Sequence, residues 1–156
     1  MDGDGNDNDL NWLGFLRRYI ILIALFNSLW EILQMPLYTL WNNDSWLTII
    51  YSIIHCTFGD ILIALTAISL SLLLLAKANW PHQNFQIVAI LTVLIGISYT
   101  LYSEWLNIYI HKSWAYNDLM PLLSLGPWQI GLSPLLQWLI LPSIALWQSK
   151  KVIPCK

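Results

Sequence analysis

The chain has 156 residues, of which 57% are hydrophobic and 10% are charged, and its formal net charge at pH 7 is −2. Soluble domains carry about a quarter charged residues, so a water-soluble globular domain is excluded by composition. No basic stripe is present that would favour binding to nucleic acid. We therefore expect an all-α integral membrane protein.

The first segment of the chain is polar and acidic, since four of the nine acidic residues fall within the first nine positions. We expect a disordered tail over residues 1–16. A helix needs roughly 20 apolar residues to cross a membrane. Four later segments have this length, and they predict a bundle of four antiparallel transmembrane helices within 17–149, followed by a basic tail at 150–156. The expected spans are 19–41, 46–75, 85–110 and 128–147.

The basic residues orient this bundle. With four spans, both termini and the loop at Lys77 lie on one side of the membrane, and Lys112 lies on the other. The first side holds six of the seven basic residues: Arg17, Arg18, Lys77, Lys150, Lys151 and Lys156. Positive loops stay in the cytoplasm. We therefore expect both termini to be cytoplasmic, in the cytoplasmic (inner) membrane of a bacterium.

The first three spans carry ionisable side chains at membrane depth: Glu31, His55, Asp60 and Glu104. With a rise of about 1.5 Å per residue, all four lie in the outer half of the membrane or near its midplane. Such groups are costly in hydrocarbon and normally face the interior of a bundle or a wet cavity. His55 and Asp60 lie about 140° apart around their helix and therefore flank a groove. Gly59, between them, is expected to admit a close neighbouring helix.

The connection between the third and fourth spans is long, aromatic and, in part, apolar enough to dip back into the membrane. We expect three of its residues to form a lid over an outward-opening pocket: Trp114, Tyr116 and Asp118. Ser133 and Pro134 form a typical N-cap and N1 pair for a helix. Gln137, one turn later, is a ligand-binding candidate, although a lone intramembrane amide more often joins helices.

The residues of this pocket fit several functions. Glu31, His55, Asp60 and Glu104 are donors that suit Fe, Mn or Zn, although no known metal-ligand motif is present. The same four side chains could instead act as catalytic acids and bases on a lipid or isoprenoid-like substrate. A subunit of a transporter, acting with a membrane partner or as a homo-oligomer, is a further reading. The fourth alternative is that the chain is a structural protein whose buried polar groups only hold the helices together.

Overall fold

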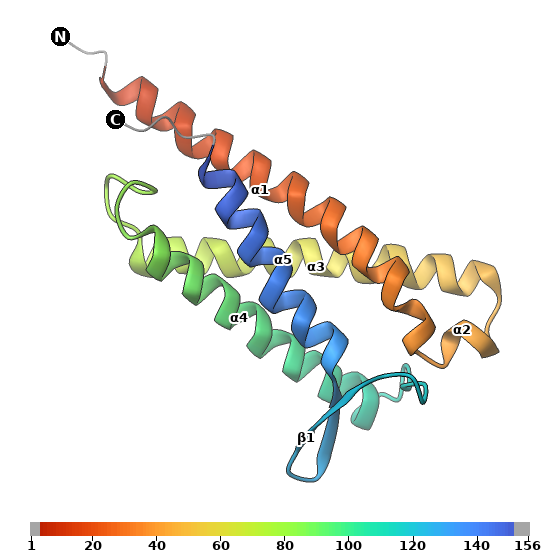
Figure 1. Ribbon diagram of the computed structural model, residues 1–156. Helices are drawn as coiled ribbons and strands as arrows, with labels where there is room; N and C mark the ends of the chain where they lie inside the picture. The colour runs from red at the N-terminus through yellow and green to blue at the C-terminus, as the bar shows by residue number, and fades with distance from the viewer. Residues whose placement is uncertain (1–3, 152–156) are drawn as a thin grey trace.

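The structure, a computed structural model, describes residues 4–151 and is mostly helical. Its four long helices alternate in direction, so that α1 begins at the end of the bundle where α5 finishes (Figure 1). The ends of the expected tails, at 1–3 and 152–156, lie outside the described residues. The elements are the helices α1 (Asp4–Gln34), α2 (Leu40–Asn43), α3 (Trp46–Leu75), α4 (Phe85–Trp105) and α5 (Leu132–Lys150), the 3-10 helix η1 (Met35–Leu37), the π-helix η2 (Leu106–Ile110), and the strands β1 (Leu122–Leu125) and β2 (Trp128–Gly131).

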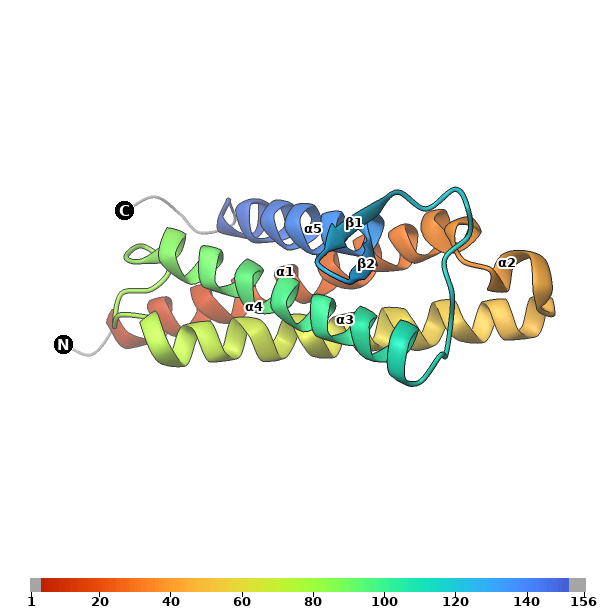
Figure 2. The ribbon, with the colours of Figure 1, turned by 90° about the horizontal axis from the view of Figure 1, so that it is seen from below.

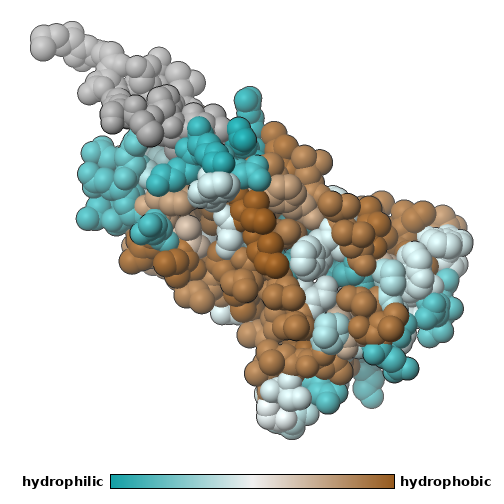
Figure 3. All heavy atoms as spheres, in the orientation of Figure 1, coloured by the Kyte–Doolittle hydropathy of each residue, from teal (hydrophilic) through white to brown (hydrophobic). Residues whose placement is uncertain are grey.

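Three helical segments are long and apolar enough to cross a membrane: Trp12–Leu37, Trp46–Leu75 and Phe85–Ile110. On the face shown in Figure 3, apolar residues cover the middle of the molecule and polar residues gather towards its two ends. These features indicate a membrane-embedded protein. Helix α5 is not among the three segments, so the fourth span stays a prediction.

Helix α1 differs from its expected form at both ends. It begins at Asp4, so residues 4–16, which were expected to be disordered, are helical. Acidic residues favour the first turns of a helix because they complement its dipole. At the other end, Pro36 lacks a backbone N–H and cannot continue the helix. The α-helix therefore stops at Gln34, and the chain turns through η1 and α2 into α3.

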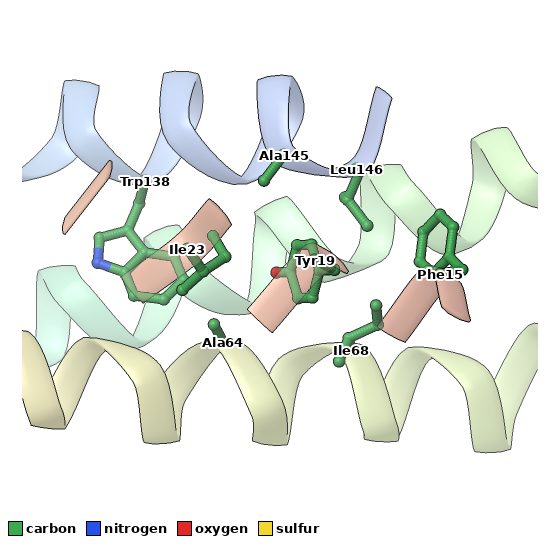
Figure 4. Close-up of a cluster of buried hydrophobic side chains, with 8 residues drawn as sticks. All are labelled: Phe15, Tyr19, Ile23, Ala64, Ile68, Trp138, Ala145 and Leu146. Carbon is green, nitrogen blue, oxygen red and sulfur yellow. The ribbon is translucent and has the colours of Figure 1, made fainter. Parts of the chain in front are cut away.

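The hydrophobic core fills the half of the bundle in which α1 begins and α5 ends. Buried side chains from α1, α3 and α5 meet there: Phe15, Tyr19, Ile23, Ala64, Ile68, Trp138, Ala145 and Leu146 (Figure 4). Gly96 of α4 admits Trp138, because a Cβ atom at Gly96 would lie 2.2 Å from the Trp138 ring. Gly59 does not admit a neighbouring helix as expected, since nothing lies within 4 Å of a Cβ placed there.

The segment before α5 forms a β-hairpin, which corrects the expectation of an all-α fold. Strands β1 and β2 pair antiparallel, with Leu122 opposite Gly131 (Figure 2). Gly126 turns the chain with φ of +61°, a conformation that hairpin turns require and that Gly adopts without strain. Helix α5 consequently begins at Leu132 instead of residue 128, and its N-cap is Gly131 instead of Ser133.

Candidate functional site

A cavity of about 680 Å³ lies between the four long helices. It occupies the half of the bundle nearer the hairpin, which we call the hairpin end. Its size falls within the usual range of small-molecule sites, roughly 300–1,000 Å³. Exposed side chains of α3 and α4 form part of its wall, so the cavity opens sideways between these two helices: Tyr51, Leu62, Thr66 and Tyr99. Gly59 lines the cavity, which explains the empty space beside it.

Gln137 is the centre of a buried hydrogen-bond network in the cavity wall. Its Nε2 atom lies 2.8 Å from Asn27 Oδ1, 3.1 Å from Glu31 Oε1 and 2.9 Å from Asp60 Oδ2. A primary amide has two N–H donors, so these three acceptors share two hydrogens. Gln137 is 2% exposed and connects α5 to α1 and α3 in one set of contacts. The Gln137 amide thus joins helices and contacts two of the predicted acidic groups.

Gln34 extends the network towards the hairpin end. Its Nε2 atom donates to Glu31 Oε1 at 2.7 Å and to Gln137 Oε1 at 3.2 Å. Its Oε1 atom accepts from Ser133 Oγ at 2.9 Å, and Ser133 Oγ lies 3.3 Å from the indole nitrogen of Trp30. Ser133 therefore binds another side chain and does not cap its own helix. The donors of Gln34 and Gln137 converge on Glu31, which leaves its carboxyl group well supplied with hydrogen bonds.

Glu31 and Asp60 form a close acidic pair. Glu31 Oε1 and Asp60 Oδ2 lie 3.1 Å and 2.9 Å from the same nitrogen atom, Gln137 Nε2, and both side chains are buried. Two buried carboxyl groups this close favour the state in which one of them is protonated, because two adjacent negative charges repel each other. Within residues 12–151, no Lys, Arg or His pairs with these carboxyl groups or with Glu104. The wall of the cavity is therefore acidic and lacks a basic partner.

Glu104 of α4 belongs to the same cavity and is held from the loop that precedes the hairpin. The phenol of Tyr116 donates a hydrogen bond to its carboxyl group. Tyr116 also pairs through its backbone with Tyr38, and the two rings lie 5.7 Å apart. Burial and the nearby Glu104 carboxyl raise the pKa of Tyr116, which keeps the phenol protonated as a donor. Tyr116, which was expected to form part of a lid, thus orients the carboxyl group of Glu104, one of the predicted site residues.

The other two predicted lid residues take different places. Trp114 lines the cavity, and its indole N–H is buried. Asp118 does not reach the cavity; it is exposed in a small surface hollow with Asn42 and Asn43. The loop returns along η1, where Asn117 N donates to Leu37 O, and this path places Asp118 beside α2 and away from the cavity.

His55 is separated from the acidic network. Its ring stacks on Tyr51, with centroids 5.7 Å apart and an interplanar angle of 19°, and it is exposed at the rim of the cavity. Over the described part of the chain, no three His, Cys, Asp or Glu residues are placed to hold a metal ion. The structure therefore does not gather the expected donors His55, Glu31, Glu104 and Asp60 around one point.

Several residues of the site were missed or misread from the sequence. Helical periodicity groups Gln34 with Glu31 but cannot show its partners on α5. Trp30, which no sequence pattern assigns to the site, donates to Ser133. Thr100 is 6% exposed, lines the cavity, and has an Oγ1 atom without a partner among the described residues. Comparison of the chain with protein-family models, curated proteins and solved structures finds no match.

Proposed function

We propose that this chain is a four-span membrane protein whose cavity binds a small, membrane-soluble ligand at the outer face of the membrane. The observation that carries the proposal is a ligand-sized cavity whose wall holds the Glu31–Asp60 pair, Glu104 and the buried Thr100 hydroxyl, which has no partner among the described residues. Buried polar groups without partners are unfavourable and are rare in folded proteins. A ligand in the cavity would satisfy the Thr100 hydroxyl.

The distribution of charge supports this orientation. Arg17, Arg18, Lys150 and Lys151 are exposed at the end of the bundle opposite the hairpin, as is the loop at Lys77. Of the lysines and arginines that the structure describes, Lys112 alone lies at the hairpin end. The positive-inside rule then assigns the hairpin end to the outer face, and both ends of the chain to the cytoplasm of a bacterial cell.

A binding role is favoured over conduction by the packing below the cavity. The core around Phe15, Ile68 and Leu146 is largely apolar. The buried hydroxyls nearby, of Ser71, Thr92 and Ser149, each donate to a carbonyl of their own helix, so the hydrogen-bond network of the cavity does not continue through that half of the bundle. Ion and proton pathways require a chain of polar groups or water. The Glu31–Asp60 pair places an acid and a base together, so proton transfer to a bound ligand is chemically available at the cavity.

Two Gly→Phe variants test the proposal. Phe at Gly59 would fill the cavity, whereas Phe at Gly14 provides a matched control, since nothing lies within 4 Å of a Cβ at either position. Each protein is purified in mild detergent and extracted with organic solvent, and its small molecules are quantified by mass spectrometry. We expect a hydrophobic compound in the wild type and in Gly14→Phe that falls at least about tenfold in Gly59→Phe. Equal content in the two variants, or no compound in the wild type, would contradict the proposal.

A further inference from the structure

The cavity wall carries three carboxyl groups and no basic group paired with them, and this imbalance limits the kinds of ligand that can bind. Each helix around it contributes different groups: α1 provides Glu31, α3 provides His55, Cys56 and Asp60, α4 provides Glu104, and α5 provides the neutral amide of Gln137. His55 is the basic group of this set, and it stacks on Tyr51 at the rim instead of pairing with a carboxyl group. A buried carboxylate requires a positive partner or a proton. The described chain supplies no such partner inside the cavity.

The remainder of the wall suits an organic cation. Aromatic side chains from every side line the cavity: Tyr38, Tyr51, Tyr99, Trp114 and Trp138. The faces of aromatic rings attract cations, most strongly where water is excluded. Thr100, buried and without a partner, adds a free hydroxyl group to the same wall. Carboxyl groups and aromatic faces together form a site for a positively charged group attached to an apolar body.

We infer that the ligand is a lipophilic organic cation, such as a hydrophobic amine or a quaternary ammonium compound; this inference rests on the proposed ligand-binding function. Its charged group lies against Glu31, Asp60 and Glu104, and its apolar part lies among the aromatic rings towards the opening between α3 and α4. On binding, the O–H bond of the Glu31–Asp60 pair breaks and the proton leaves to solvent. The positive charge of the ligand replaces it, so the net charge of the site is conserved.

A neutral ligand and a metal ion satisfy the cavity less well. A neutral molecule of the same shape would fill the volume but would leave the three carboxyl groups without a positive partner. A bare metal ion would need several donors around one point, and the described residues provide no such group of three. A cation with a large apolar surface satisfies both the charge and the volume of the cavity.

The test compares a matched pair of probes. One is a phenylalkyl trimethylammonium ion, and the other is the hydrocarbon in which a tert-butyl group replaces the trimethylammonium group. The two have the same shape and differ in charge. Their dissociation constants are measured by equilibrium dialysis against wild type, Gly59→Phe and Gly14→Phe in the same detergent. We expect the wild type to bind the cation at least about tenfold more tightly than the hydrocarbon, with loss of binding in Gly59→Phe alone.

The carboxyl variants make the result specific to charge. Glu104→Gln keeps an oxygen that can accept from Tyr116, and Asp60→Asn provides a second variant if the first does not fold. In either variant, the ratio of the dissociation constant of the hydrocarbon to that of the cation should fall below about three. Equal binding of the two probes, blocked by Gly59→Phe, would overturn the cation inference and leave the pocket in place. If neither probe binds saturably, or if Gly59→Phe binds both normally, the proposed function itself is overturned.

Discussion

Replacement of Gln137 by Leu tests whether the buried network holds the helices together. The amide donates to Asn27, Glu31 and Asp60 and accepts from Gln34. Leu has a similar volume and makes none of these four contacts. The change therefore removes hydrogen bonds between α5 and its neighbours without opening a large void.

The magnitude follows from these contacts. An interhelical hydrogen bond in a membrane contributes about 0.6 kcal/mol on average. The two N–H groups and the oxygen of the amide allow about three such bonds, which contribute about 2 kcal/mol. The loss also leaves buried acceptors on the acidic pair short of donors, and this adds about 1–3 kcal/mol. We expect Gln137→Leu to lower the free energy of unfolding by about 3–5 kcal/mol, from these two contributions.

The assay is equilibrium unfolding in mixed micelles, in which the fraction of SDS is raised and the loss of helical structure is followed by far-UV circular dichroism. Gln148→Leu is the matched control, because Gln148 lies on the same helix and its side chain makes no hydrogen bond to the described residues. We expect the control to stay within about 0.5 kcal/mol of the wild type. If both variants unfold at the same SDS fraction, the network does not stabilise the bundle.

Two further predictions use the same protein. Gly96→Ala should lower the unfolding free energy by about 1–3 kcal/mol, because its Cβ atom would lie 2.2 Å from the Trp138 ring. Gly59→Ala, which adds a Cβ atom in open space, should raise the unfolding free energy by about 0.5–1 kcal/mol. A change of the same sign for both variants in the SDS assay would refute this account of the packing. Burial raises the pKa of Tyr116 above 10.0, so unfolding releases its proton more readily and stability should fall as pH rises above about 10. Tyr116→Phe should make that fall shallower in unfolding curves measured from pH 8 to 11, and an unchanged slope would contradict it.

The helical, membrane-embedded character of the chain was predictable because it depends on local sequence. Apolar runs of sufficient length have few alternatives to a helix in hydrocarbon, and three of the expected segments have the required length and composition. Helix α3 occupies Trp46–Leu75, the range expected for the second span, because Ser45 caps it by accepting from Thr48 N. The hairpin was not predicted, since its leucines and tryptophan resemble a membrane segment when hydropathy alone is considered.

The site was predictable only in part because its contacts join distant segments. The same-face spacing of Asn27, Glu31 and Gln34 identifies a polar side of α1, yet their partners Ser133 and Gln137 are about a hundred residues away. The rotation of α3 is set by the packing of its buried residues, such as Ala64 and Ile68. That rotation buries Asp60 and exposes His55, and no pattern within the helix indicates it.

The sideways opening of the cavity has a consequence for selectivity. A ligand that passes between α3 and α4, beside Tyr51 and Tyr99, comes from the surrounding lipid and not from bulk water. Occupancy is then governed by the mole fraction of the compound in the bilayer, which depends on its partition coefficient. Two compounds with equal contacts in the cavity would occupy it differently if they dissolve unequally in lipid. The membrane would thus make the first selection, before any residue of the protein touches the ligand.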